Sequence, residues 1–527
     1  MGKLTSLRIL TKFFVSKEVG FCLQELGPLK LKGDLDIEHL GKVKSVMDAK
    51  EANMSIKQLN TLWLSWDRNE ESELHENVEE ILEVLHLDVQ QLLRLEVEGY
   101  ECLEKLWLSN CREVESLQAL QDMTSLQELK LKHLPKLESL PDCFGCLPSL
   151  HTLNHRSMRN VHEESIDALQ LYLVKSLRTY ILPDHYGDQL SPHPDVLKCH
   201  SLRVLDFVKR ENLSSSIGLL KHLRYLNLSG GGFETLPGSL FKLWNLQILK
   251  LDRCRRLKML PNSLICLKAL QQLSFNGCQE LSRLPPQIGK LTSLRILTKF
   301  FVGKERGFCL EELGSQKLKG DLDIKHLGNV KSVMDAKEAN MSRLPLLGKL
   351  PSLKTIRIQN MIHVEYFYQE SYDGEVVFRA LEDLSLRQLP NLKMLSRQYG
   401  ENMFPRFSIL EIDGCPKFLG EEVLLHRLHS LSVISCGKFN LSAGFKCLQK
   451  LWISECKGVK NLQALQYMTS LKEIRLRNLH ELESLPDCFG NLSLLHTLSI
   501  FHCSKLTCLP MSLSLSDFFL FLSPPES

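Results

Sequence analysis

The sequence has 527 residues, several times the usual length of a single globular domain, so a long repeat array or several domains are expected. Hydrophobic residues make up 43% of the chain and charged residues 24%, which excludes a disordered chain, a collagen-like chain and a polytopic membrane protein. The formal net charge is +3, without the basic excess that favours nucleic acid as a partner. About one residue in five is leucine, an excess typical of chains built from repeats.

The first residues, MGKLTSLRILTKFFV, imitate a secretory leader and carry Gly2 and Ser6 at the spacing of a myristoylation signal. The same stretch recurs at residues 289–302, where neither signal can act, so its pattern needs only a structural reason. At the other end, residues 513–522 are too few and too polar to cross a bilayer, which takes about 20 apolar residues. We therefore expect a cytoplasmic protein with no membrane span.

A regular period runs through residues 222–297, where Leu223, Leu246, Leu270 and Leu294 lie 23 or 24 residues apart. This spacing is within the period of leucine-rich repeats, and each unit opens with L-x-x-L-x-L or a close variant. The L-x-L alternation favours a short strand with its leucines inward, and the apolar patch that follows returns the chain. The sequence predicts an α/β leucine-rich repeat solenoid in two blocks, with a curved parallel sheet and with loops and short helices on its convex side.

The repeat phrase recurs along most of the chain, and one block is duplicated. Residues 2–55 align with residues 289–342, and residues 102–153 align with residues 447–498. We predict a partial repeat block at 1–153, an irregular seam at 154–198 that breaks the stacking, a main repeat block at 199–512 and a tail at 513–527. An amphipathic helix is expected at 65–85. Further repeat units are expected to start near Leu62, Leu103, Leu126, Leu150, Leu202, Leu353, Leu381, Phe407, Leu448, Leu471 and Leu495.

The 17 cysteines follow the repeat and do not fall into pairs. Cys143 and Cys146 have the spacing of a zinc or redox pair, but no second pair lies at zinc-finger distance. Carboxylates alternate with leucine and isoleucine at Asp34 and Asp36 and again in the second copy, which places them on the wet face of a strand. We expect no metal. Seven cysteines end the strand phrase: Cys111, Cys254, Cys278, Cys415, Cys436, Cys456 and Cys503.

The sequence contains no constellation that carries catalysis. A phosphate loop requires G-x-x-x-x-G-K-[ST], and no Gly-Lys pair of this chain is followed by Ser or Thr. The polar run around His155, His162 and Glu163 lacks the register of a zinc protease helix. We therefore expect no enzyme, no catalytic residue and no cofactor.

Several longer phrases resemble the leucine-rich repeat region of plant intracellular disease-resistance proteins of the coiled-coil, nucleotide-binding, leucine-rich repeat class. These phrases are GDLDIEHLGKVKSVMDAKEANM with its later copy, KQLNTLWLSW, and LPLLGKLPSLKTIRIQNM. The seam, with SLRTYILP, is similar to that family's junction between nucleotide-binding region and repeats, although here it follows another repeat block. No stretch resembles the coiled-coil or nucleotide-binding domain.

The resemblance implies a non-enzymatic recognition module of plant innate immunity. Its ligand would be a pathogen effector or a guarded host protein, with a nucleotide-binding domain in cis or in trans as a further partner. The alternatives are an extracellular leucine-rich receptor ectodomain and a truncated resistance-gene product without function. Strand residues that flank inward leucines are the candidate ligand contacts, since Arg and Trp dominate binding hot spots. They are Tyr225, Asn227, Lys250, Asp252, Arg357, Arg387, Trp452, Arg475, Arg477, Trp107 and Lys130.

Overall fold

The structure, a computed structural model, describes most of the chain but not all of it. The described parts are residues 2–43, 45–54, 57–66, 102–111, 117, 120, 123–134, 137, 147–156, 174–181, 196–209, 212–302, 310–313, 316–326, 347, 350–362, 364–368, 378–396, 404–418, 427–437, 439, 441, 444–487, 492–506 and 519–522.

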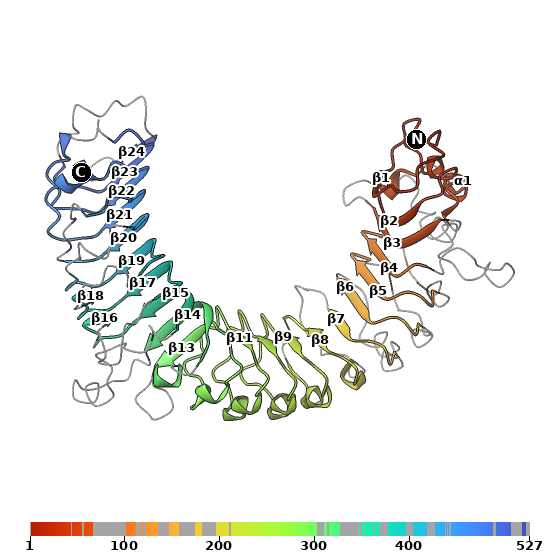
Figure 1. Cartoon of the computed structure of the whole chain (residues 1–527), viewed down its shortest axis with the longest axis horizontal. Coiled ribbons are helices and arrows are strands. Elements are labelled where there is room, and N and C mark those ends of the chain that lie inside the picture. Colours follow the sequence, from red (N-terminus) through yellow and green to blue (C-terminus); the bar gives the residue numbers. More distant parts are fainter. Residues whose placement is uncertain are drawn as a thin grey trace. The chain divides into compact units, whose positions relative to one another are not determined.

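The chain forms two compact units, each built on parallel strands (Figure 1). The first unit comprises Met1–Lys258 with Gly277–Glu280, and the second comprises Met259–Asn276 with Leu281–Ser527. In each unit the strands follow one another in chain order, which is the arrangement of stacked repeats.

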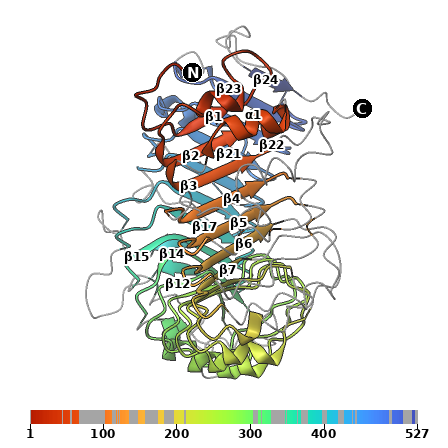
Figure 2. The same cartoon turned by 90° about the vertical axis from the view of Figure 1, so that its right-hand side faces the viewer.

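The described residues of the first unit form ten strands, and each neighbouring pair for which a register is defined is parallel. Figure 2 shows β2 to β6 side by side. The strands are β1 (Lys12–Phe14), β2 (Lys32–Glu38), β3 (Gln58–Ser65), β4 (Lys105–Ser109), β5 (Glu128–Lys132), β6 (Thr152–Arg156), β7 (Thr179–Ile181), β8 (Val204–Asp206), β9 (Tyr225–Asn227) and β10 (Ile248–Lys250).

The second unit begins with two short strands and continues in a ten-stranded sheet, with a separate pair, β16 and β18, at its side. Its strands are β11 (Gln272–Ser274), β12 (Ile296–Leu297), β13 (Lys299–Val302), β14 (Lys319–His326), β15 (Ser352–Gln359), β16 (Tyr366–Tyr368), β17 (Asp383–Arg387), β18 (Met394–Ser396), β19 (Ile409–Asp413), β20 (Ser430–Ile434), β21 (Lys450–Ser454), β22 (Glu473–Arg477), β23 (Thr497–Phe501) and β24 (Phe519–Leu522).

Leucine burial explains why these segments become strands. In β4 the alternating residues Leu106 and Leu108 are almost completely buried, while Lys105 and Trp107 point the other way. The same alternation holds in β22, where Ile474 and Leu476 are buried and Arg475 and Arg477 are exposed. A fully buried leucine contributes about 1.5–3 kcal/mol, so the phrase L-x-L fixes both the strand and its facing. The predicted leucine-rich repeat solenoid is confirmed.

Several of the described connections between strands contain a single 3₁₀ turn, which explains how so short a repeat can close. Figure 1 shows those between β8 and β11 on the side of each turn away from its strand. The one described α-helix, α1 (Val46–Glu51), is capped by the Ser45 side chain, which accepts a bond from the Asp48 N–H. Among the described residues the 3₁₀ helices are Leu23–Leu26, Leu40–Lys42, Val196–Lys198, Ser215–Leu219, Gly238–Lys242, Asn262–Cys266, Ile288–Lys290, Leu310–Leu313 and Gln463–Tyr467.

A left-handed residue follows many of the strands and is itself followed by the repeat's cysteine or by an apolar residue. Arg253 and Glu455 have φ of 60° and 54°, and Gly277 and Gly414 hold the same position at 72° and 64°. The next residue turns inward, and where it is cysteine its thiol bonds to a backbone carbonyl at or just after a strand: Cys278 Sγ lies 3.0 Å from the Leu251 oxygen. The cysteine position predicted from the repeat is therefore a turn position whose thiol adds a hydrogen bond to a backbone carbonyl.

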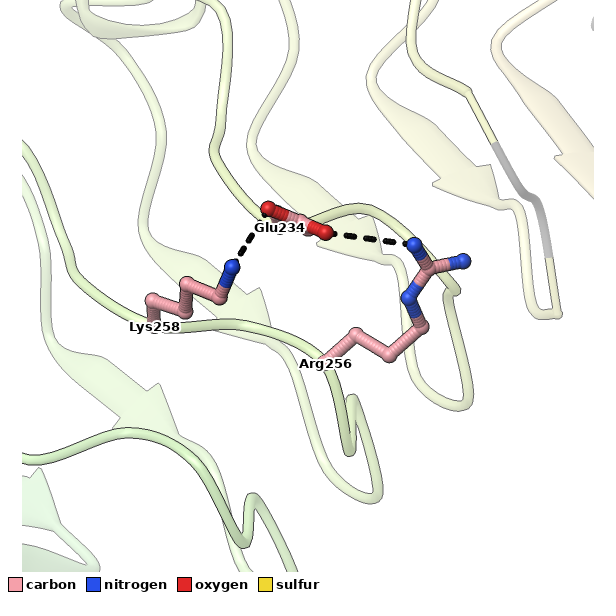
Figure 3. Close-up of polar contacts among 3 residues, drawn as sticks. All are labelled: Glu234, Arg256 and Lys258. Carbon is pink, nitrogen blue, oxygen red and sulfur yellow. Dashed lines mark hydrogen bonds and ion pairs between the residues drawn. The ribbon is translucent and has the colours of Figure 1, made fainter.

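Ion pairs between successive turns lie at the loop edge of the first unit. Glu234 accepts hydrogen bonds from Lys258 Nζ at 2.7 Å and from Arg256 Nη2 at 3.2 Å (Figure 3). The Lys258 N–H also donates to the Glu234 carbonyl at 3.1 Å, so backbone and side chains join the same two turns. The bonds from Lys258 and Arg256 lower the pKa of the Glu234 carboxyl. Since all three side chains are exposed, this clamp orders the edge more than it stabilises the fold.

The described strands run through the segment where the sequence suggested a seam. β7 lies in this segment and pairs in parallel with β6 and β8. It does so because Leu177 and Tyr180 are buried in the repeat's inward positions, with a tyrosine where other units have leucine. Near the other end, β24 adds a strand to the sheet within the expected tail. The four-part division stays a prediction, and the compact units divide the chain at other residues. The expected helix at 65–85 lies almost entirely outside the described residues.

The left-handed turn residue gives a stability prediction. We expect Gly277→Ala to lower the free energy of unfolding by about 1 kcal/mol, because a Cβ is strained at positive φ. Gly238→Ala is the matched control: its φ is not left-handed and its added Cβ has no neighbour within 4 Å, so it should be neutral or slightly stabilising. Urea unfolding measures both, and equal losses would contradict the role given to the turn.

A buried lysine gives a pH prediction. Lys57 is 1% exposed and donates from Nζ to the carbonyls of Leu26 and Leu29 at 2.8 and 2.9 Å. Burial lowers its pKa from 10.5 to about 8. Between pH 8 and pH 10.5 the Lys57 amine is therefore protonated in the unfolded chain and largely neutral in the folded chain. We expect the stability of the first unit to rise by about 3 kcal/mol from pH 8 to pH 10.5. Urea midpoints followed against pH should lose this rise in Lys57→Met. An identical slope in the variant would contradict the assignment.

Candidate functional site

The candidate site is the open face of each sheet, formed by the strand residues that lie between inward leucines. Because the strands pair in register, open-face residues of successive strands stand in rows. In the first unit one row runs from Asp36 through Trp63, Trp107 and Lys130 to Asn154. In the second unit the corresponding row includes Arg357, Ser385, Glu411, Ser432, Trp452 and Arg475.

Two predicted contacts of the first unit, Trp107 and Lys130, lie in one aromatic and cationic stack. The rings of Trp63 and Trp107 are stacked with centroids 4.7 Å apart, and Lys130 Nζ lies 3.3 Å from a Trp107 ring centroid. Lys130 Nζ also contacts Glu128 at 2.6 Å. Neither indole N–H has a hydrogen-bond partner among the described residues. The stack is therefore a rigid platform that still holds two unused donors.

Trp63 was missed at the level of sequence, although a signal for it exists. The phrases LWLS at residues 62–65, LWLS at 106–109 and LWIS at 451–454 place tryptophan between inward residues of β3, β4 and β21. All three tryptophans consequently belong to the open-face rows, whereas only Trp107 and Trp452 were predicted as contacts.

The predicted residues of β9 and β10 are held by their own neighbours. Asn227 donates from Nδ2 to Asp206 at 3.0 Å and accepts from the Ser229 N–H and hydroxyl at 3.1 and 2.6 Å. Its polar atoms are thus bonded to Asp206 of β8 and to Ser229 in the following turn. Lys250 Nζ lies 5.6 Å from the Tyr225 ring, and the Asp252 carbonyl accepts from the Gly230 N–H at 2.6 Å. Burial, with Asp206 nearby, raises the pKa of the Tyr225 hydroxyl.

Arg357 and Arg387 lie within a network of carboxylates in the second unit. Glu411 accepts from Arg387 Nη2 at 2.7 Å and from the Ser385 hydroxyl at 2.9 Å. Burial raises the pKa of Asp323 and Asp383, and the positive charge of Arg357 opposes that rise in both. This part of the open face therefore balances its charges internally.

The remaining predicted residues, Trp452, Arg475 and Arg477, lie on β21 and β22. Trp452 lies beside Arg475 of the neighbouring strand, and it is 38% exposed. The Glu473 carboxylate forms a short ion pair with Arg475, and it lies 3.8 Å from Lys450 Nζ. The structure thus divides the predicted contacts into separate clusters on two open faces, and none of these clusters has the geometry of a catalytic centre.

Within the described part of the chain, no group of three or more His, Cys, Asp or Glu side chains is placed to hold a metal ion. The carboxylates that alternate with leucine and isoleucine in the two copies lie beside lysines. Asp36 is 3.4 Å from Lys12 Nζ, and Asp323 is 4.0 Å from Lys325 Nζ. Cys143 and Cys146 lie outside the described residues. None of the described helices is long and apolar enough to cross a bilayer.

The fold and its open faces define a leucine-rich repeat protein, a class of binding modules. A family model described as a leucine-rich repeat region matches residues 176–413, and one described as R13L1/DRL21 leucine-rich repeats matches residues 23–158. Disease resistance protein RGA2 of Solanum bulbocastanum is 31% identical over 282 residues, covering 49% of this chain and 26% of the relative. A disease resistance protein of Arabidopsis thaliana is 34% identical over 325 residues, covering 51% and 22%. The chain is built of leucine-rich repeats, and these repeats are similar to those of plant disease-resistance proteins.

This chain therefore spans about a quarter of the length of these two relatives. Solved structures with the same kind of fold are more distant. A Leptospira interrogans leucine-rich repeat protein is 19% identical with a TM-score of 0.44, covering 98% of this chain and 95% of that one. The plant peptide hormone receptor RGFR1, solved with RGF2, is 14% identical with a TM-score of 0.44, covering 99% and 88%.

The cysteines give a testable prediction about thiol chemistry. The twelve described cysteines form no disulfide, and burial raises the pKa of both Cys415 and Cys436 to about 12, so these two thiols are protonated and unreactive near pH 7. We expect thiol counting in non-reducing denaturant to find nearly all 17 cysteines. In the folded protein, Cys102, Cys266 and Cys447 should react first because they are exposed. Several disulfides would instead favour the extracellular receptor ectodomain.

Proposed function

We propose that the open sheet faces recognise a protein ligand in plant defence, either a pathogen effector or a guarded host protein. The observation that supports this proposal is the set of tryptophans beside cations, Trp107 with Lys130 and Trp452 with Arg475, on strands whose backbones are fixed by the ladder. Aromatic and arginine side chains held rigidly lose little entropy on binding and dominate the energetics of protein interfaces. The relatives' role in disease resistance supports the same ligand class.

A nucleotide-binding domain, in cis or in trans, is the second partner in this proposal. Its support is the family itself, since the relatives extend well beyond the length of this chain. A nucleotide-binding domain from such a relative, expressed separately, is the direct probe for this contact. Binding that persists in the open-face variants described next would place that contact outside the open faces.

Matched tryptophan variants test the recognition of a protein ligand. The full chain is first screened against a panel of purified pathogen effectors and host proteins on a biosensor surface. For a true ligand we expect Trp107→Ala or Trp452→Ala to weaken binding roughly thirtyfold, equivalent to about 2 kcal/mol for a hot spot. Trp244→Ala is the control, because Trp244 is 70% exposed yet lies outside the strands, after the 3₁₀ helix Gly238–Lys242.

Thermal unfolding of each variant separates loss of contact from loss of fold. A ligand that loses affinity with Trp244→Ala but not with the two open-face variants would contradict the proposal, since it would bind the loop and helix side. Ligands insensitive to all three tryptophans would contradict it as well.

A further inference from the structure

A small hollow interrupts the open face of the second unit over β20, β21 and β22. Its volume is about 190 Å³, and its lining side chains include Ser430, Ser432, Lys450, Trp452 and Arg475. The cause lies in the register, which sets Ser432 beside Trp452 and Ser430 beside Lys450. Two small side chains next to two large ones leave a depression between the strands.

The size of this hollow restricts what can fill it. Sites for small molecules usually measure about 300–1,000 Å³, and this hollow is smaller than that range. Its floor is strand backbone, so it cannot deepen without breaking the ladder. The hollow fits a single side chain of a larger partner better than a free metabolite.

The charges around the hollow favour an anion. Glu473 is largely covered, with its side chain 17% exposed, and it contacts both Lys450 and Arg475. Those cations remain more accessible, at 65% and 54% exposed. One covered carboxylate thus orients two accessible cations, and the lining keeps a net charge of one positive unit. An incoming carboxylate would meet complementary charge at positions that are already ordered.

Two further groups of the hollow, the Ser432 hydroxyl and the Trp452 indole, could also contact a ligand. The Ser432 hydroxyl oxygen is buried and has no hydrogen-bond partner among the described residues. The partly exposed Trp452 indole offers an apolar surface next to the cations. A buried hydroxyl without a partner is uncommon and costs free energy until a bond is made.

Other features of the second unit are less suited to a ligand carboxylate. Arg387 is already bonded to Glu411 on the same face. A larger hollow of about 760 Å³ at the strand ends contains Glu455, but Ser435 and Asn478 already donate to that carboxylate. Accessible cations, an unused hydroxyl and an exposed indole occur together over β20 to β22.

We propose that this hollow receives an acidic side chain of the protein ligand, its carboxylate bound by Lys450, Arg475 and the Ser432 hydroxyl and its adjoining apolar group packed on Trp452. The inference rests on the proposed function, and it adds the chemistry of one contact. An acidic residue next to an aromatic or aliphatic residue is the ligand feature that this lining recognises.

Capped peptides test the hollow without knowledge of the ligand. The full chain is labelled with 5-fluorotryptophan, which gives five fluorine signals, and Trp452→Phe identifies the signal of Trp452. Acetyl-Phe-Glu-Ala-amide is titrated against acetyl-Phe-Gln-Ala-amide, which differs only in the charge. We expect the glutamate peptide to shift the Trp452 signal saturably and the glutamine peptide to bind at least about tenfold more weakly.

Two arginines on one strand provide matched variants. Arg475→Gln should weaken the glutamate peptide at least about tenfold. Arg477→Gln removes the same charge from β22 but not from the lining, and it should leave the titration nearly unchanged. Lys450→Met gives a second loss from the lining on another strand, and circular dichroism checks that each variant is folded.

Several outcomes would overturn the inference. Equal binding of both peptides would make Trp452 a purely apolar contact, and equal losses in the two arginine variants would indicate a diffuse field. Preference for acetyl-Phe-Gln-Ala with a free carboxyl end would assign the hollow to a chain terminus. A flat titration would also reject the hollow, whereas the recognition of a protein ligand depends separately on the tryptophan variants.

Discussion

Backbone hydrogen bonds between successive parallel strands are the constraint from which the other features of each unit follow. Thr355–Gln359 pairs with Asp383–Arg387 residue by residue, so an inward residue always lies beside an inward residue. A slip of one residue would expose the leucines and bury the charged side chains between them. The register that protects the core therefore also fixes which side chains are neighbours on the open face. The groups that could contact a ligand are therefore neighbours from adjacent strands rather than successive residues of one strand.

The ladder also determines the turn that follows many of the strands. The chain must leave the sheet at once, and it does so through a left-handed residue such as Asn110 or Asn478. The next position points inward, where a thiol can bond to a carbonyl that directly follows the strand of the preceding repeat, as Cys254 does to Leu228 at 3.2 Å. This geometry accounts for cysteines that recur with the repeat and remain unpaired. Burial then raises their pKa values and keeps them chemically inert.

Much of the fold could be predicted from the sequence because each repeat carries its own strand signal. The units expected near Leu62, Leu103 and Leu381 contain β3, β4 and β17. β7 was missed because Tyr180 fills a leucine position, so the inward volume is kept while the L-x-L phrase is lost. The physical requirement is a buried apolar side chain, and leucine is only its usual form.

The candidate site could be predicted only in part. Alternation within a strand shows that Trp107 and Arg387 face outward, and no more than that. Their partners, Trp63 and Glu411, come from other strands and are set by the register between them. Asn227 shows the opposite limit: it occupies an outward position by sequence, yet its hydrogen bonds bind it to Asp206 of β8 and to its own turn. Only cross-strand geometry separates residues available to a ligand from residues that complete the fold.

The duplicated block shows how such a sheet can change what it binds without changing its core. β2 and β14 carry the same phrase, GDLDI, and both bury its leucine and isoleucine. Beyond the duplicated segment the sequences diverge, so Asp36 stands beside Trp63 whereas Asp323 stands beside Arg357. One carboxylate borders an aromatic stack, and its copy belongs to a network of charges. Since inward residues alone are held by packing, copying a repeat and replacing its neighbour creates a new surface at little cost to stability.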